Sequence, residues 1–236
     1  MNKELLQLEN RIYQTLAVKS ILKQKVYENT IETFQLLKTS VNDVAKEFNK
    51  KLFKFQKRVR FEFRDHGDFV VQLRMAGDML VFIQHTNTFQ FDRNHKIWEL
   101  PYVKEDPLNS YCGMISVYNF LDDSFKYHRA EDLGYLIARI FINKSNHFFV
   151  EGKRQVCYHY KNFGKETITK NDIHKFLLNA LVYTLQFDLL VPPYDTIKIA
   201  TVGQMTEKMN FSQIKTGKRL GFQFNSDDVL EDKDSA

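Results

Sequence analysis

The sequence predicts an α+β protein, with an N-terminal helical hairpin followed by an antiparallel sheet that has helices packed on one face. Three observations predict this class. The first glycine is Gly67 and the first proline is Pro101, so the opening 66 residues contain neither of the common helix breakers. After Lys57 the apolar period changes from helical spacing to alternation. Tight turns then join successive apolar runs, and strands joined so closely must be antiparallel.

Two stretches before Lys57 have apolar residues three and four apart, as in an amphipathic helix. The first stretch contains Leu5, Leu8, Ile12 and Leu16. The second contains Ile31, Phe34, Leu37, Val41, Val44, Ala45, Phe48, Leu52 and Phe55. Between them, Asn29 precedes Glu32 by three residues, which is the spacing of a helix cap. We expect two helices, near 2–27 and 30–55. The alternative is one helix of about 54 residues and roughly 80 Å.

The middle of the chain has the pattern of an antiparallel meander. Val59, Phe61 and Phe63 alternate with charged residues, and apolar runs at 69–73, 79–83, 89–91, 96–98 and 114–120 predict further strands. Helical spacing then predicts a helix over 130–142. We expect a hairpin over 148–158, a helix opened by Thr169 and Asp172, and a last strand over 197–202. Residues 211–224 remain unassigned.

The expected domains are an N-terminal helical segment (1–56), an α+β domain (57–225) and an acidic tail (226–236) that is disordered. The tail carries five acids and one lysine, so the chain has a net charge of +5 and the body without it +9. Such a tail is typical of a solvated end that aids solubility. The alternative is a decoy that competes with an anionic partner for the basic body.

Several classes of protein lack their local signature in this sequence. No apolar run reaches the roughly 18 residues of a membrane span, and the first residues lack the order of a signal peptide, so we expect a cytoplasmic protein with no membrane partner. Cys112 and Cys157 are too few for a disulfide framework. The sequence contains no phosphate-binding glycine loop, HExxH, CxxC or GxSxG motif. The spacing of cysteines and histidines fits no usual zinc module, so we expect neither a metal nor a cofactor.

Basic residues gather between the second predicted helix and the first predicted strand. Lys46, Lys50, Lys54 and Lys57 are four, four and three residues apart and so share a helical face. Such a face can neutralise phosphates without reading sequence. The alternative is a solvated helix end, stabilised by the helix dipole. The predicted anion-binding residues are Lys46, Lys50, Lys51, Lys54, Lys57, Arg58 and Arg60. The nearby Phe61, Phe63 and Phe69 alternate as core residues do, so we expect them to be buried and not to stack on bases.

A second group of residues suggests metal-dependent chemistry. Glu151-Gly152-Lys153 follows the apolar run 148–150, and residues two apart on a strand share a face. An acid there can hold Mg²⁺ while the lysine positions the attacking water. This tripeptide resembles the acid-x-lysine motif of restriction-endonuclease-like nucleases. The resemblance implies an upstream acid as well, for which Asp122 and Asp123 are the candidates. The alternative is that Glu-Gly forms a hairpin turn.

The sequence thus leaves two main classes of function. The first is a non-enzymatic binding or assembly module whose basic surface meets nucleic acid or an acidic protein. It includes a homodimer through the N-terminal helices, because the long apolar stripe of the second helix needs a cover, which is either the protein's own sheet or a second copy. The second is a Mg²⁺-dependent nuclease that uses Asp122 or Asp123, Glu151 and Lys153. A small-molecule sensor is a third class, for which the sequence offers no support.

Overall fold

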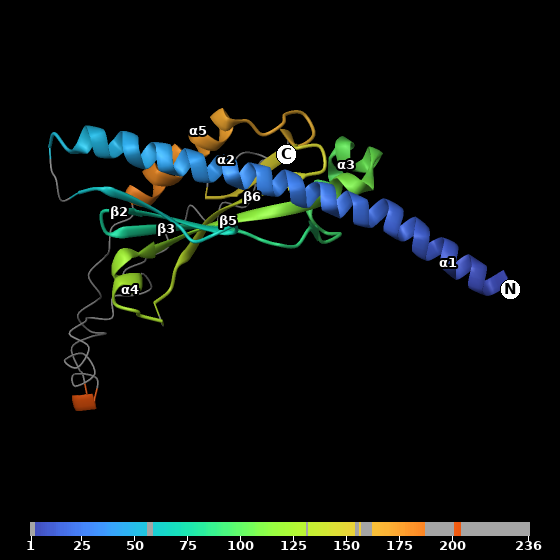
Figure 1. Cartoon of the computed structure of the whole chain (residues 1–236), viewed down its shortest axis with the longest axis horizontal. Helices are drawn as coiled ribbons and strands as arrows, with labels where there is room; N and C mark the ends of the chain where they lie inside the picture. Colours follow the sequence, from blue (N-terminus) through green and yellow to red (C-terminus); the bar gives the residue numbers. More distant parts are fainter. Residues whose placement is uncertain are drawn as a thin grey trace, which may run out of the picture.

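The structure is a computed structural model, which describes residues 3–55, 59–130, 132–153, 156, 162–186 and 201–203. This part of the chain forms a long N-terminal helix, an antiparallel sheet and several shorter helices (Figure 1). The predicted α+β class is therefore confirmed. The predicted acidic tail lies outside the described residues.

The predicted helical hairpin is wrong, and the single-helix alternative is correct. Helix α1 (Lys3–Thr15) continues through a π-helical turn, η1 (Leu16–Ser20), into α2 (Ile21–Leu52) without a break. At 1.5 Å rise per residue these elements together are about 75 Å long. Figure 1 shows α1 extending well beyond the sheet.

The helix continues past Asn29 because this side chain makes tertiary contacts and does not cap. Asn29 is buried within α2, and its Nδ2 donates hydrogen bonds to the carbonyl oxygens of Asn143 at 3.0 Å and Lys144 at 2.9 Å. The hydroxyl of the adjacent Thr30 donates back to the carbonyl of Val26 at 2.7 Å. Asn and Thr favour helix ends when they compete locally for backbone groups, but here the Asn29 amide nitrogen and the Thr30 hydroxyl donate to other carbonyls from inside a continuous helix.

The sheet has seven strands in the described part of the chain, in the order β1-β2-β3-β5-β6-β7, with β4 also paired to β5. Every pair is antiparallel. The strands are β1 (Phe61–Asp65), β2 (Val70–Met75), β3 (Asp78–Gln84), β4 (Phe89–Gln90), β5 (Tyr111–Leu121), β6 (Tyr135–Asn143) and β7 (Phe148–Gly152).

The predicted helix over 130–142 is wrong, because the structure places β6 there. Ile140 faces the core beneath α2, whereas Phe141 packs in a second cluster on the other face of the sheet. A strand covered on both faces has a continuous apolar run, in which helical spacing can be found by coincidence.

Other predicted elements differ in part. Residues 96–98 form a 3-10 helix, η2 (Lys96–Glu99), followed by α3 (Pro101–Glu105) and η3 (Pro107–Ser110). Strand β7 forms its hairpin with the preceding strand β6. The predicted hairpin partner at 157–158 lies outside the described residues, as do residues 197–200 of the predicted last strand.

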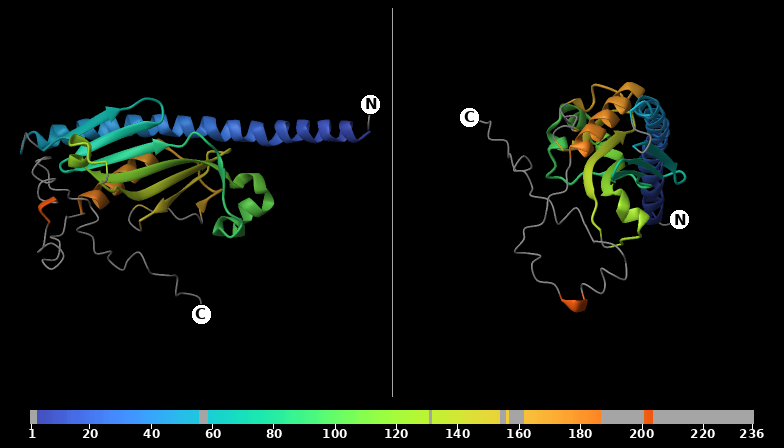
Figure 2. Two further views of the ribbon diagram at one scale, coloured as in Figure 1. Left: turned by 90° about the horizontal axis from the view of Figure 1, so that it is seen from below. Right: turned by 90° about the vertical axis from the view of Figure 1, so that its left-hand side faces the viewer.

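The main core lies between the sheet and the two helices α2 and α5 (Lys170–Leu185). Both helices lie on the same side of the curved sheet (Figure 2). Phe34 of α2, Phe82 of β3 and Phe176 of α5 are almost fully buried there. The predicted start of α5 is confirmed, because Thr169 and Asp172 form a reciprocal capping box.

The opposite face of the sheet is covered at its ends. The segment η2-α3-η3 packs on one end around Ile97, Phe141 and Phe149. Helix α4 (Asp122–Lys126) follows β5 at the other end (Figure 1). None of the described helices combines the length and the apolar character that crossing a membrane requires.

Candidate anion-binding surface

Three lysines form a row along the outer side of α2 and its last turn. Lys46, Lys50 and Lys54 are exposed and follow one another at four-residue steps, about 6 Å along the helix axis. At 100° per residue, Lys46 and Lys50 point away from the buried Val41 and Val44. No ion pair joins these three lysines to an acid within the part of the chain that the structure describes. We call Lys46, Lys50 and Lys54 the lysine row.

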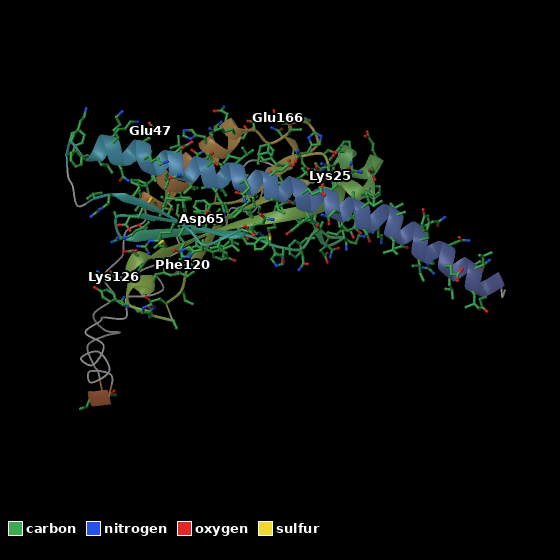
Figure 3. The ribbon with its side chains drawn as sticks, viewed as in Figure 1. Lys25, Glu47, Asp65, Phe120, Lys126 and Glu166 are labelled. Atoms are coloured by element: carbon green, nitrogen blue, oxygen red, sulfur yellow. The ribbon has the colours of Figure 1, made fainter. Side chains whose placement is uncertain are left out.

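The acids beside the lysine row are paired with other cations. Lys51 Nζ lies 2.5 Å from Glu47 Oε1, and Lys170 of α5 lies 3.8 Å from Asp43. The hydrogen bond from Lys51 holds the pKa of the Glu47 carboxyl below its usual value. Figure 3 labels Glu47 near the C-terminal end of α2, far from the N-terminus. Lys51 is thus paired with an acid, whereas the lysine row has no acidic partner among the described residues.

Two aromatic side chains are largely exposed where α2 ends. Phe53 is 66% exposed and Phe55 is 85% exposed. The predicted apolar stripe included Phe55, and that part of the prediction is wrong. Because α2 ends at Leu52, the stripe packs against the core only as far as Phe48 and Leu52. Phe53 was not singled out from the sequence. Its position off the apolar stripe is nevertheless a sequence signal that its side chain is exposed.

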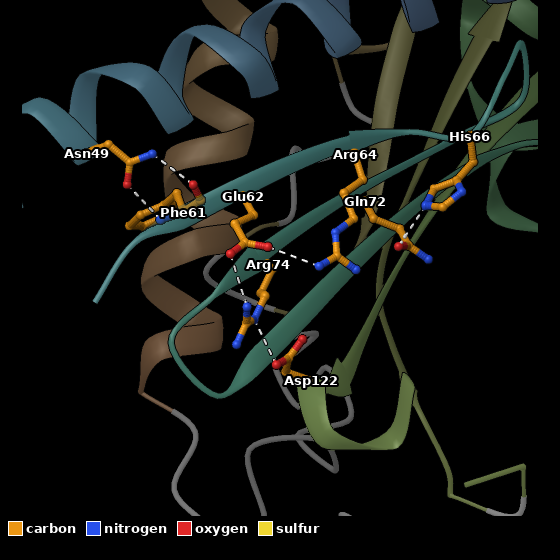
Figure 4. Close-up of polar contacts among 8 residues, drawn as sticks. All are labelled: Asn49, Phe61, Glu62, Arg64, His66, Gln72, Arg74 and Asp122. Atoms are coloured by element: carbon orange, nitrogen blue, oxygen red, sulfur yellow. Dashed lines mark hydrogen bonds and ion pairs between the residues drawn. The ribbon is translucent and has the colours of Figure 1, made fainter. Parts of the chain in front are cut away.

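The start of β1 is fixed to the last turns of α2. Asn49 Nδ2 donates to the carbonyl of Phe61 at 2.8 Å, and the backbone N–H of Phe61 donates to Asn49 Oδ1 at 2.7 Å (Figure 4). The ring of Phe61, buried as predicted, stacks on that of Phe48 with centroids 5.3 Å apart. This clamp keeps the exposed Arg60 next to the end of α2. Lys57 and Arg58, which were also predicted to bind anions, lie outside the described residues.

We call the surface formed by these exposed residues the basic tip. It consists of Lys46, Lys50, Lys51, Lys54 and Arg60 together with Phe53 and Phe55.

The arginines on the neighbouring strands do not extend the basic tip, because carboxylates neutralise them. Glu62 accepts from Arg64 at 3.0 Å and from Arg74 at 3.1 Å, and Arg74 Nε lies 2.7 Å from Asp122 Oδ2 (Figure 4). His66 and Gln72 form a further polar contact at the end of this hairpin. Around this end of the described chain, the unpaired positive charge therefore lies at the end of α2 and at Arg60, and not on these strands.

The structure does not bring the predicted nuclease residues together. Glu151 forms an ion pair with Arg139, its partner across β6 and β7. Arg139 in turn pairs with Ser116 of β5, which lies six residues before Asp122, the first residue of α4. Six residues of strand span about 20 Å, so Asp122 and Glu151 lie far apart on the sheet.

The other two predicted nuclease residues, Asp123 and Lys153, do not bring the acids at the two ends of the sheet together. Asp123 is exposed in α4, and Lys153 follows β7, where its backbone N–H donates to Ile137. Among the residues described, no three His, Cys, Asp or Glu side chains are grouped so that they could hold a metal ion. Cys112 is fully buried, which raises the pKa of its thiol.

A second exposed surface lies on the N-terminal part of the long helix. Leu5, Leu8, Ile12 and Leu16 share one face, and each is more than half exposed. This apolar stripe of α1 and η1 is uncovered because the sheet ends before it (Figure 1).

No model of a known protein family matches the chain, and no curated protein or solved structure is significantly similar to it.

Proposed function

We propose that this chain is a cytoplasmic, non-enzymatic binding or assembly module that holds an anionic partner, nucleic acid or an acidic protein, on the basic tip. The observation that carries the proposal is the lysine row, which has exposed charges and no acidic partner among the described residues. Exposed lysines at regular spacing attract phosphates or carboxylates with little geometric demand. The fully buried Cys112, which is a free thiol, agrees with a reducing compartment.

A charge-matched pair of variants tests the proposal. The first replaces Lys46, Lys50 and Lys54 by Gln. The control replaces Lys25, Lys104 and Lys165 by Gln, which are also exposed and unpaired in the described part, so both variants lose three charges. Binding of a labelled oligonucleotide and of polyglutamate is then titrated at several salt concentrations.

We expect the first variant to weaken binding and to lower the slope of log K against log salt by about 2, because each phosphate contact contributes about 0.7 for a single strand. The control should keep the slope of the unmodified chain. Equal loss in both variants would show that only net charge matters, which would contradict a site at the basic tip.

The same assay separates this function from the nuclease alternative. A binding module retains the oligonucleotide intact in Mg²⁺, whereas a nuclease cleaves it with time. Cleavage that Glu151→Gln abolishes would support an active site with Asp122 or Asp123, Glu151 and Lys153. The distance between Asp122 and Glu151 gives that alternative less support.

We further propose a homodimer through the apolar stripe of the N-terminal helix. Four large apolar side chains on one exposed helical face form the kind of surface that a second copy covers.

A pair of double variants tests the dimer. Leu8→Glu with Ile12→Glu places charges on this stripe. The control, Gln7→Glu with Gln14→Glu, adds the same charges on the opposite side of the helix. The first variant should sediment at 28.0 kDa, and the control and the unmodified chain at twice that mass. A monomeric unmodified chain at high micromolar concentration would contradict the dimer.

A further inference from the structure

The aromatic residues of the basic tip narrow the chemistry of its partner. Phe55 exposes most of its ring, and Phe53 exposes two thirds of its surface. A large apolar side chain in water lacks the stabilisation that burial would provide. Contacts between lysines and carboxylates or phosphates need no such ring. Charge alone therefore accounts for the exposed lysines of the basic tip but not for its exposed rings.

The backbone holds these rings at the end of the lysine row. The N–H of Phe53 donates to the carbonyl of Asn49 at 2.9 Å, and the N–H of Phe55 donates to that of Leu52 at 2.9 Å. Lys54 stands between the two rings in sequence, and Lys50 lies one turn earlier. Two exposed aromatic residues therefore follow the lysine row along the chain, where α2 ends.

We infer that the basic tip binds single-stranded nucleic acid, with the lysine row along the phosphates and a base stacked on Phe55. This inference rests on the proposed function and names its partner. Bases of a single strand expose their faces, whereas those of a duplex are covered by their neighbours. Aromatic rings beside a positively charged track are the usual means of binding unpaired bases. An acidic protein offers charges but no bases to stack.

An anionic membrane is the other surface that lysines and phenylalanines can meet. The lysine row runs along the helix axis for about 12 Å, away from the rings. Rings inserted into a bilayer by a helix that stands upright on it would leave Lys46 well above the headgroups. A row of lysines matches the phosphates along a nucleic-acid strand better than it matches the flat surface of a membrane.

The experiment measures fluorescence anisotropy of a labelled 12-nucleotide oligothymidine, the same length of duplex DNA, and sedimentation with vesicles containing phosphatidylserine. The variants are Phe55→Ala, Phe55→Leu and Phe55→Trp in the full chain. Phe55→Leu keeps an apolar side chain but removes the ring. Because residue 55 is 85% exposed, these changes leave the core intact, which circular dichroism verifies.

Stacking predicts that Phe55→Ala and Phe55→Leu each weaken oligothymidine binding about 5- to 100-fold, and that Phe55→Trp does not. Duplex binding should stay unchanged in all three. If Phe55 variants bind oligothymidine normally while loss of the lysine row weakens it, stacking is overturned and the proposed anion-binding function stands. If neither set of variants affects binding, both fail. Vesicle binding that Phe55→Leu preserves, without oligothymidine binding, would overturn the inference in favour of a membrane surface.

Discussion

Lys38 and Asp65 join α2 to the hairpin of β1 and β2 by an unequal ion pair. The side chain of Lys38 is 9% exposed, whereas that of Asp65 is 48% exposed, and the two lie 2.8 Å apart. Lys38 also donates to the carbonyl of Gly67 at 2.5 Å. In the sequence Lys38 only interrupts an apolar stripe, because its partner lies 27 residues away.

We expect Asp65→Ala to destabilise the protein more than Lys38→Met. The first change leaves a buried ammonium without its carboxylate, at a cost of about 2 kcal/mol. The second leaves Asp65 with water around it, and the methionine fills the space of the lysine stem beside Phe34. Urea unfolding of the two variants measures both free energies. Equal losses would contradict an asymmetric pair.

Asp65 also predicts a pH dependence. The hydrogen bond from Lys38 lowers the pKa of the Asp65 carboxyl in the folded state. A lowered pKa contributes stability that is present above the unfolded pKa of about 3.9 and is lost as the pH falls through the folded value. The free energy of unfolding should therefore fall below pH 4 in the unmodified chain. In Lys38→Met this fall should be smaller, as unfolding at a series of pH values can measure.

At the scale of elements, α2 and β5 approach each other at a glycine. A Cβ on Gly113 would lie 1.9 Å from Thr30 Oγ1 and 2.8 Å from Thr30 Cβ. A glycine within a strand signals a close approach, and this signal is visible in the sequence. The sequence does not tell which element approaches, because Thr30 is 83 residues away.

Gly113→Ala should lower the free energy of unfolding by about 2 kcal/mol, because the helix must move away from the sheet or Thr30 must leave its rotamer. Gly77→Ala is the control. Nothing lies within 4 Å of a Cβ at Gly77, and its φ is not positive, so that change should stay within about 0.5 kcal/mol. Denaturation midpoints compare the two. A neutral Gly113→Ala would contradict the close contact.

At the scale of the whole molecule, the apolar stripe of α1 and the basic tip lie towards opposite ends of one helix. From Leu16 to Lys46 the helix rises about 45 Å. A dimer formed through the stripe would therefore leave both basic tips open. We expect Leu8→Glu with Ile12→Glu to lower the affinity for a long single strand at least tenfold, because two linked sites act together. Affinity for a 12-nucleotide strand should not change. Equal effects on both lengths in the binding titration would contradict two independent tips.

The acidic end of the sequence bears on the same charge balance. Removal of residues 226–236 raises the formal net charge from +5 to +9. If these residues compete with the anionic partner, their deletion should tighten oligonucleotide binding, and more so at low salt, where charges are screened less. Titration of the truncated and full chains at two salt concentrations measures this. A solvated end that only aids solubility predicts no difference in the binding constant at high salt and little at low salt.

Two kinds of prediction about the fold succeeded for local reasons. The class and the antiparallel arrangement follow from period and turn length, which depend on residues close in sequence. The capping box of Thr169 and Asp172 is likewise complete within four residues. The prediction of a helix over 130–142 failed, because burial on both faces of β6 depends on distant elements. Helical spacing then no longer distinguishes a strand from a helix.

The sequence by itself determined the order of most elements and the shared helical face of Lys46, Lys50 and Lys54. Only the tertiary structure decided that the helix continues past Asn29, because that side chain meets a turn more than a hundred residues away. It also decided that Phe55 lies outside the core. Periodicity records which side of an element is apolar. Where an element ends against its neighbours, and which charges are neutralised there, depends on contacts between residues that the chain keeps far apart.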